Sequence, residues 1–401
     1  MPSLALPQDC TGCAACDNAC PQSAIQMTAD ERGFLHPAVT SEMCVECGLC
    51  EKRCPVIQPR VSESVDANVF AAWHANKDIR LDSSSGGAFS ALAESIINQG
   101  GVVYGAVWDG PRRVIHRRIV SVDNLLELRK SKYLPSVIAK AFRDVKKDLK
   151  NGRKVLFAGT PCQIAGLKAY LQHMEVDDLI TVDFICHGVP SPAVYDKYID
   201  ALENHYGRKV QMVNFRDKKL GVECNLILKV NLSDGSCKEI MFDWNSFYRG
   251  FVENVYLRTS CYNCRFNKFP RVADISLADF RGLGEKVRFS KIKERHLGFT
   301  GVIVNTDKGE LLLRQSPNLI FEQRPNAELF NSQPHLVHPA SVSSLSTSFW
   351  NEFKVLPYEE LAVKYMPMNL RNRLMNVARF ILRPRLYYAV GRVAKSLILR
   401  Y

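Results

Sequence analysis

Eight of the 14 cysteines repeat one spacing twice near the N-terminus. Each copy reads C-x2-C-x2-C-x3-C and is followed by a proline; the residues are Cys10, Cys13, Cys16, Cys20, Cys44, Cys47, Cys50 and Cys54. Thiolates ligate iron, and closely spaced thiolates can surround one cubane cluster. The proline after each fourth cysteine stops the chain from continuing as a helix. The repeated spacing therefore predicts two 4Fe-4S clusters.

This spacing is typical of bacterial ferredoxins, in which the fourth cysteine of each run binds the cluster of the other run. The predicted ligand sets are Cys10, Cys13, Cys16 and Cys54 for the first cluster, and Cys44, Cys47, Cys50 and Cys20 for the second. Zinc is a weaker alternative, because zinc sites use two CxxC pairs or CxxC with histidines and need no trailing Cys-Pro. Disulfides are weaker still, because a cytosolic chain keeps its thiols reduced.

Two more cysteines follow apolar runs that predict buried strands. Cys162 comes after the run 154–158 and a Gly-Thr-Pro turn, in which Thr160 suits a helix N-cap and Pro161 the first helical position. Cys186 comes at the end of the run 179–185, and both runs are expected in one sheet. Cys162 is also a candidate nucleophile, because a helix N-terminus stabilises a thiolate. Burial in the core is the third interpretation of both cysteines.

The remaining cysteines differ in their spacing. Cys261 and Cys264 form a CxxC before the strand-like run 273–277, and this pair can converge with Cys162 and Cys186 on a third cluster. Cys224 and Cys237 bracket the turn of a predicted hairpin and have no metal-like spacing. We therefore expect these last two cysteines to be structural.

The region from about Val69 to about Gln315 resembles the coenzyme F-420 hydrogenase/dehydrogenase beta subunits, iron-sulfur flavoproteins that include chlorophyll reductases acting on the 7-hydroxymethyl pigment. The resemblance is carried by Ser84-Ser85-Gly86-Gly87, Ser131-Lys132-Tyr133, Gly159-Thr160-Pro161-Cys162-Gln163, Cys186-His187-Gly188 and Cys261-Tyr262-Asn263-Cys264 followed by Ala273-Asp274-Ile275. It implies that Cys162, Cys186, Cys261 and Cys264 ligate one 4Fe-4S cluster beside FAD. Several relatives also carry an N-terminal two-cluster segment.

The resemblance also implies which segments contact the flavin: Ser84, Ser85, Gly86, Gly87, Lys132, Tyr133, Thr160 and Gln163. The loop 83–87 consists of small residues before an apolar helix, which suits a pyrophosphate at a helix N-terminus, although a plain turn explains it equally. Surface charge and amphipathic packing are the alternatives for Lys132 and Tyr133. Where many relatives read Asp-Phe-Trp-Gly, this chain has Asp279-Phe280-Arg281-Gly282. His187 is a candidate proton donor, with a hydrogen-bonded loop histidine as the alternative.

The elements that must position these residues alternate between strand and helix. Strands are predicted near 69–73, 101–107, 154–158, 179–185 and 301–304, helices near 88–98, 137–149 and 193–205, and a β-rich insertion over 210–242. We expect a fold of the α+β or α/β class. Its parts are a two-cluster ferredoxin domain over 1–59, a mixed α/β flavin-binding body over 69–150 and 151–345, and a basic helical tail over 350–401.

Composition and charge exclude several classes. Apolar residues make up 46% and charged residues 23% of the chain, which excludes wholesale disorder. The chain lacks a transmembrane-length apolar run and a signal-peptide pattern, so a cytoplasmic address, or one at the inner face of the membrane, is expected. Nine positive charges of the net +12 follow Glu360, where no acidic residue occurs. This distribution favours a local docking surface over nucleic-acid binding.

The tail has three interpretations. From Arg385 onward, helical spacing separates the basic residues Arg385, Arg392, Lys395 and Arg400 from the apolar residues Leu386, Val390, Val393 and Leu397. This pattern is typical of an interfacial helix on an anionic membrane. An acidic protein partner is an alternative, and so is a helix that packs its apolar face on the body.

Two functional classes follow. The first is an FAD- and 4Fe-4S-dependent oxidoreductase acting on an organic substrate, with a role in polysaccharide biosynthesis conceivable from the resemblance. The second is a non-catalytic electron-transfer subunit that links a reduced carrier (deazaflavin, ferredoxin or NAD(P)H) to a partner complex. In both, a redox partner protein or a reduced carrier is required, and the protein's task is to place and tune the cofactors.

Overall fold

A computed structural model describes residues 1–59, 67–174, 176–218, 221–222 and 227–368. Two predictions concern residues outside these ranges: the tail helix from Arg385 and the structural role of Cys224. Within the described ranges, no helix has both the length and the apolar character needed to cross a membrane.

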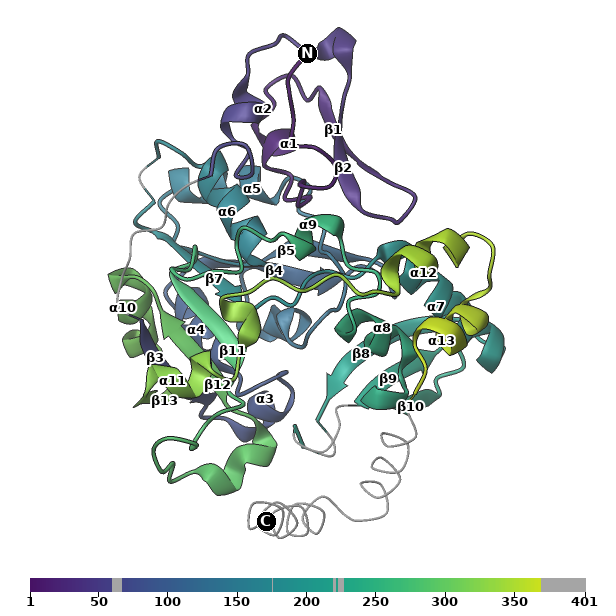
Figure 1. The fold of residues 1–401 in the computed structure, drawn as a ribbon. Helices are drawn as coiled ribbons and strands as arrows, with labels where there is room; N and C mark the ends of the chain where they lie inside the picture. The colour runs from purple at the N-terminus through teal and green to yellow at the C-terminus, as the bar shows by residue number, and fades with distance from the viewer. Residues whose placement is uncertain (60–66, 175, 219–220, 223–226, 369–401) are drawn as a thin grey trace.

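The N-terminal segment forms a small unit at the top of Figure 1, next to the body. Its elements are α1 (Ala15–Ala19), β1 (Ile25–Ala29), β2 (Leu35–Val39) and α2 (Leu49–Lys52). The two strands pair antiparallel, and a short helix follows the first cysteines of each run. The backbone repeats as well, because Gly12 and Ala14 in the first run and Glu46 and Gly48 in the second all have positive φ. The sequence duplication is therefore also a duplication of local structure.

An eight-stranded mixed sheet forms the centre of the body, in the order β13-β3-β12-β11-β7-β6-β4-β5. Its strands are β3 (Asn68–His74), β4 (Val102–Trp108), β5 (Val114–Ile119), β6 (Val155–Ala158), β7 (Leu179–Phe184), β11 (Ile275–Asp279), β12 (Thr300–Val304) and β13 (Leu319–Arg324). The four strands β4, β6, β7 and β11 run parallel, and antiparallel strands complete both edges. The predicted mixed α/β body is thus confirmed. The sequence analysis missed β5 and β13, which lie at the edges of the sheet.

Helices cover both faces of the sheet. They are α3 (Lys77–Leu81), α4 (Ala88–Asn98), α5 (Ala141–Lys150), α6 (Pro161–Tyr170) and α10 (Asp307–Gln315), with the short α11 (Asn326–Phe330) beside β3. One core joins α4 and α10 to alternate side chains of the strands, for example Val103 of β4. The opposite core joins α5 and α6 to the intervening side chains, such as Val102 and Tyr104, because successive strand residues point to opposite faces.

The β-rich insertion forms its own three-stranded antiparallel sheet, in the order β10-β9-β8. Its strands are β8 (Val210–Asp217), β9 (Ile227–Leu232) and β10 (Cys237–Met241), so the predicted hairpin is confirmed. It shares one core with α7 (Pro192–Tyr206), α8 (Ser246–Val252), α12 (Ser346–Phe353) and α13 (Tyr358–Tyr365). The segment expected to begin a separate tail near residue 350 therefore packs inside the body as far as Met366, which is fully buried.

The N-terminal unit and the body share a core. Cys13, Ala14 and Ala15 pack in the same buried cluster as α5 and α6. A Cβ placed on Gly166 of α6 would lie 3.0 Å from Cys13 Sγ, so the absence of a side chain there allows the cysteine loop to approach the helix. The contact leaves the first cysteine run directly against the helix that begins near Cys162.

Candidate functional site

The cysteines of each predicted N-terminal ligand set lie near one another, and their assignment as cluster ligands stays a prediction. Burial, together with the nearby thiolate charges of Cys162, Cys10 and Cys54, raises the pKa of Cys13 to about 12. Burial and the charges of Cys13, Cys10 and Cys54 also raise the pKa of Cys16. Cys54 therefore lies with the first three cysteines of the other run. A separate small cavity of about 20 Å³ is lined by the second set, Cys20, Cys44, Cys47 and Cys50.

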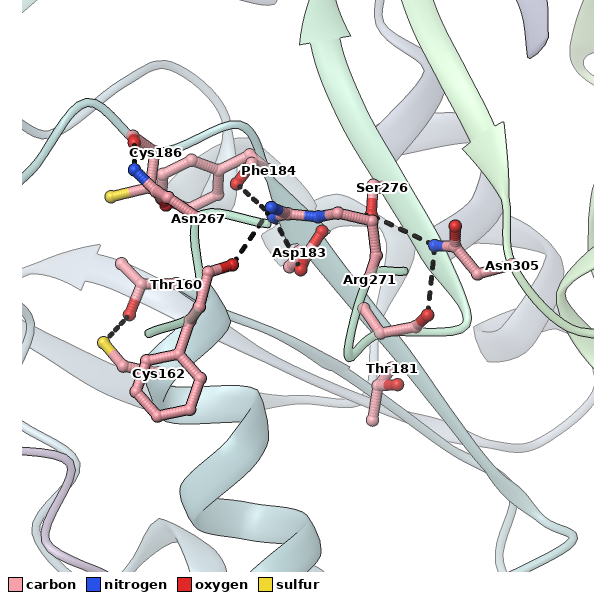
Figure 2. Close-up of polar contacts among 12 residues, drawn as sticks. Thr160, Cys162, Thr181, Asp183, Phe184, Cys186, Asn267, Arg271, Ser276 and Asn305 are labelled. Carbon is pink, nitrogen blue, oxygen red and sulfur yellow. Dashed lines mark hydrogen bonds and ion pairs between the residues drawn. The ribbon is translucent and has the colours of Figure 1, made fainter. Parts of the chain in front are cut away.

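The two strand-end cysteines of the body meet at one edge of the sheet. Thr160 caps α6 with a capping box, since its backbone N–H donates to Gln163 Oε1 at 3.0 Å and its own side chain faces the third helical residue. This cap places Cys162 in the first turn of α6. Because β6 and β7 are parallel neighbours, the carboxyl end of β7 lies beside this turn and carries Cys186. Figure 2 shows both thiols on the same side of the sheet edge.

A cavity of about 470 Å³ is lined by all four body cysteines, Cys162, Cys186, Cys261 and Cys264. Burial, with the charge of Cys264, raises the pKa of Cys162 to about 11, and burial with the charges of Cys162 and Cys264 raises that of Cys261 to about 12. Thiols with pKa values this high stay protonated at neutral pH unless a metal binds them, because metal coordination deprotonates a thiol. A low-pKa nucleophile at Cys162 is therefore not favoured.

The same cavity contains polar atoms without partners. Thr11 Oγ1, Ser260 Oγ and Asn267 Oδ1 are buried, belong to residues that line the cavity and have no hydrogen-bond partner. Each of these residues lies next to or near a cysteine in the chain. Buried polar atoms are nearly always paired, so three orphans around four thiols indicate a missing polar group. A 4Fe-4S cluster fits the two hydroxyl groups, because its sulfurs accept hydrogen bonds from them, whereas Asn267 Oδ1 is an acceptor that a cluster sulfur does not satisfy.

Two observations on the described residues concern a single-metal site and disulfides. Among them, no group of three or more His, Cys, Asp and Glu side chains is spaced to hold one metal ion. The described cysteines are all free thiols, and Cys237 is exposed on β10.

The flavin segment begins at the loop before α4. Gly87 is the N-cap of α4 with φ of 86°, and the Gly86 N–H donates to Thr300 Oγ1 at 2.9 Å. A Cβ on Gly86 would lie 2.5 Å from the Ala72 carbonyl oxygen, and one on Gly87 would lie 3.0 Å from His74 Cβ. Both glycines are therefore required for packing against protein. This differs from the expectation that their missing Cβ atoms let a diphosphate approach.

The neighbouring serines and lysines form a polar cluster. Ser84 Oγ lies 3.0 Å from Ser131 Oγ, and Ser85 Oγ donates to the Phe299 carbonyl at 2.8 Å. The Lys132 ammonium donates to the carbonyls of Arg129 and Lys130, and burial with the charge of Lys130 lowers its pKa to about 7. Lys132 is thus a half-buried residue whose amine is held by carbonyls and pairs with no described carboxylate, unlike the surface charge that the alternative interpretation expected.

Two residues that the sequence analysis missed complete this cluster. Lys218 donates to the carbonyls of Arg80, Ser85 and Leu297, and burial with the charges of Arg216 and Arg80 lowers its pKa to about 7. Arg216 pairs with Asp279 at 2.8 Å while its Nε atom is buried without a partner. Both lie on or after β8, in the insertion, so only the folded structure brings them to the loop.

Tyr133, Thr160 and Gln163 are occupied by protein contacts. The Tyr133 ring packs among Phe215, Phe242, Tyr248 and Phe251. Gln163 accepts from Thr160 with one end and donates to the Ser136 carbonyl and hydroxyl with the other. Thr160 Oγ1 lies 3.1 Å from Cys162 Sγ. The Thr160 and Gln163 side chains therefore shape the cysteine site, and their contact with a flavin stays a prediction.

His187 has partners at both ring nitrogens. Nε2 lies 3.2 Å from the Phe251 carbonyl, and Nδ1 lies 2.8 Å from His335 Nε2. Burial and the charge of His335 lower the pKa of His187 to about 4. The His187 imidazole is therefore neutral and has a partner at each nitrogen. This geometry favours the interpretation of His187 as a hydrogen-bonded loop histidine. A proton-donor role for His187 stays a prediction.

The four residues Asp279-Phe280-Arg281-Gly282, where the sequence departs from the resemblance, begin at the last residue of β11. Asp279 is the ion-pair partner of Arg216, and although burial opposes its ionisation, Arg216 holds its pKa below the usual value. Arg281 adds a second cation, whose charge also lowers the pKa of Asp279. This position therefore increases the positive charge near the polar cluster.

Behind the cysteine cavity lies a fully buried ion pair, drawn in Figure 2. The side chains of Arg271 and Asp183 are 0% exposed, with Nη2 and Oδ2 separated by 2.9 Å. Arg271 also donates to the Phe266 and Phe184 carbonyls, which lie two residues from Cys264 and Cys186. Asn267 Nδ2 donates to the Cys186 carbonyl at 2.8 Å. These contacts link the two loops that carry the cysteines, and no sequence motif pointed to them.

Comparison with known proteins agrees with the sequence resemblance. Residues 9–57 match the 4Fe-4S dicluster domain, and residues 152–322 match the family described as the C terminus of the coenzyme F420 hydrogenase/dehydrogenase beta subunit. A protein of the F420-reducing [NiFe] hydrogenase complex from Methanosarcina barkeri is 18% identical, with a TM-score of 0.43 and coverage of 78% of this chain and 92% of that chain. No curated protein matches. The predicted two-cluster segment is confirmed, and the resemblance of the body is confirmed over residues 152–322.

Proposed function

We propose that this chain, which joins a 4Fe-4S dicluster domain to an F420 hydrogenase/dehydrogenase beta-type region, is an FAD-dependent oxidoreductase with three 4Fe-4S clusters. Its substrate class is an organic molecule or a reduced carrier. When bound, FAD supplies exchange between two-electron and one-electron chemistry, and the clusters supply single-electron transfer. The protein residues hold these groups, exclude water from them and set their order in space.

The observation that carries this proposal is the shared wall of the 470 Å³ cavity. The four body cysteines line it together with Thr11, Gly12 and Ala14 of the first ferredoxin run. Cys162 would hold a cluster on α6 while Cys13 packs on Gly166 of the same helix. The ligands of two clusters are thus separated by one helix turn. An arrangement of this kind supports direct electron transfer between the dicluster domain and the body.

A cofactor and carrier assay tests this proposal. We expect anaerobically purified chain to release FAD in a near-equimolar amount on acid treatment. Deazaflavin, ferredoxin and NAD(P)H are then supplied separately as reductants, and bleaching of flavin and cluster absorbance is followed. Iron-replete protein without flavin would contradict the oxidoreductase proposal and leave a relay of clusters only.

The polar cluster beside Ser84 and Ser85 is the proposed diphosphate site. Lys218 is buried and Lys132 is half-buried, backbone carbonyls hold both amines, and Arg216 has an orphaned Nε donor. Burying cations without anions is costly, so an anionic ligand would stabilise this part of the fold. The fit is to the anionic part of FAD, and no contact to its ring is inferred.

Flavin affinity is expected to fall as the pH rises through about 7. The pKa values of Lys132 and Lys218 in the free protein are about 7, so both amines are charged below this pH and lose their protons above it. The charged form attracts a diphosphate, and binding therefore takes up protons. We expect Lys132→Met to weaken FAD binding by about 10- to 100-fold, since a hydrogen bond to a charged group contributes ~1.5–3 kcal/mol. Fluorescence titration of flavin-depleted protein from about pH 6 to about pH 9 measures both effects.

The matched control is Lys209→Met, which removes a surface lysine whose side chain is 80% exposed. This variant should retain the affinity and the pH dependence of the wild type. Unchanged FAD binding in Lys132→Met with full cluster content would contradict the assignment of the site.

The basic tail is proposed to bind an anionic membrane surface. Cosedimentation with vesicles containing phosphatidylglycerol should show salt-sensitive binding of the full chain and its loss in a chain ending at Met368. An earlier end at Leu356 is unsuitable, because it removes α13, whose Leu361 and Tyr365 are buried. Binding that persists without the tail, or that never occurs, would contradict this proposal, and binding to an acidic protein would support the alternative partner.

A further inference from the structure

Arg258 is a buried arginine at the boundary between the N-terminal unit and the body. It precedes α9 (Thr259–Tyr262) and is 3% exposed. Its Nε donates to the Cys10 carbonyl at 2.9 Å, and its Nη2 donates to the Leu35 carbonyl. The guanidinium also stacks over Phe34, with 5.1 Å from Cζ to the ring centroid. The side chain thus extends from the body into the N-terminal unit.

The guanidinium lies against the first cysteine run. A Cβ on Gly12 would lie 2.7 Å from Arg258 Nη1, so only a residue without a side chain leaves room for it. On the body side, the Arg258 carbonyl accepts a hydrogen bond from the backbone N–H of Cys261 at 2.9 Å. One residue therefore contacts the loops of two cysteine sets, one through its side chain and one through its backbone.

The charge of Arg258 has no carboxylate partner among the described residues, and its polar contacts there are carbonyls and the His36 ring. A buried guanidinium without an anion carries a large desolvation cost. The groups that can balance this charge are the cysteines that line the same cavity, because their thiols become thiolates when a cluster binds them. Burial raises the pKa values of Cys10, Cys162 and Cys261, and the Arg258 charge opposes that rise in all three.

We propose that Arg258 is the shared counter-ion of the first ferredoxin cluster and the body cluster, so that it both holds the two units together and raises the reduction potential of each cluster. This inference rests on the proposed third cluster. Thiolate-ligated clusters are anionic, and net charge and hydrogen bonding set their potentials. A fixed positive charge between two clusters stabilises the reduced form of each, and Arg258 is a positioning and tuning residue in this sense.

Redox titration of the full, cluster-loaded chain tests the inference. Arg258→Met is expected to lower the equilibrium constant for one-electron reduction of the body cluster by tenfold or more, which corresponds to about 59 mV. The first ferredoxin cluster should shift in the same direction. Arg258→Lys keeps the charge while losing the planar fork, so its potentials should remain closer to those of the wild type. Anaerobic titration followed by EPR measures each cluster.

Arg143→Met is the matched control, because it removes contacts between the N-terminal unit and the body without removing a charge from the cavity. Arg143 of α5 also donates to carbonyls of the N-terminal unit, at 2.9 Å to Asn18 and 2.8 Å to Cys20, and it does not line the cavity. It should leave the potential of the body cluster unchanged. Equal shifts in Arg258→Met and Arg258→Lys, no shift in either, or loss of clusters in both would overturn the proposal.

The outcome also separates this inference from the proposed function. A wild-type protein without a third cluster would contradict the proposed function. The effect of Arg258 on the potential of the first ferredoxin cluster would still be measurable. Three clusters in the wild type, with no shift of their reduction potentials in Arg258→Met, would contradict only the counter-ion role of Arg258.

Discussion

Anaerobically purified chain is expected to contain about twelve iron and twelve sulfide atoms, and Cys261→Ser about eight of each. Cys261 lines the 470 Å³ cavity and belongs to neither ferredoxin set, so its loss should release only the third cluster. Ligand sets on separate segments bind metal independently. Iron and acid-labile sulfide assays, with EPR of the reduced protein, measure the content.

The same serine substitution at Cys237 provides the control. Cys237 is an exposed thiol on β10 and belongs to no predicted ligand set, so Cys237→Ser should keep the wild-type iron content. About eight iron atoms in the wild type would contradict the third cluster and return Cys162 to the nucleophile interpretation. A loss of all clusters in Cys261→Ser would contradict the independence of the sets.

Local signals in the sequence were enough to predict the strand and helix that carry Cys162, while the four-cysteine ligand set was implied by the family resemblance and stays a prediction. Thr160 and Pro161 predicted the start of α6, and the buried run 154–158 predicted β6, because capping and strand patterns depend on neighbours in the chain. Parallel pairing of β6 with β7 then brings Cys162 and Cys186 to one edge. The helix α4 was predicted with its observed bounds, since an apolar run after Gly87 has no competing pattern.

Contacts between distant segments could not be predicted in the same way. Arg258 meets Cys10 across 248 positions of the chain, and Lys218 meets Ser85 across 133. In the sequence, each of these residues looks like any other cation, because its burial depends on what packs over it. The two glycines before α4 illustrate the reverse case, since a motif typical of phosphate binding is used here for close packing against β3 and β12.

The largest effect on stability is expected from Arg271→Leu. Arg271 and Asp183 are both fully buried, so removal of one partner leaves an unpaired charge, which costs ~3–5 kcal/mol in the free energy of unfolding. Burial already raises the pKa of Asp183 against the opposing charge of Arg271, and Asp183 Oδ1 has no partner. Loss of Arg271 would also free the Phe184 and Phe266 carbonyls. Anaerobic urea unfolding, followed by intrinsic fluorescence, measures the change in midpoint.

Two further variants separate the charge effect from a simple packing defect. Arg314→Leu breaks an ion pair with Glu310 on α10 whose arginine side chain is 59% exposed, and exposed pairs contribute only ~0.2–1 kcal/mol. The double variant Arg271→Leu with Asp183→Leu removes both buried charges, so it should be more stable than the sum of the two single losses predicts. If the losses were instead additive, the pair would act through packing alone. In that case the loops of Cys186 and Cys264 would be held by their carbonyl contacts rather than by the buried charge.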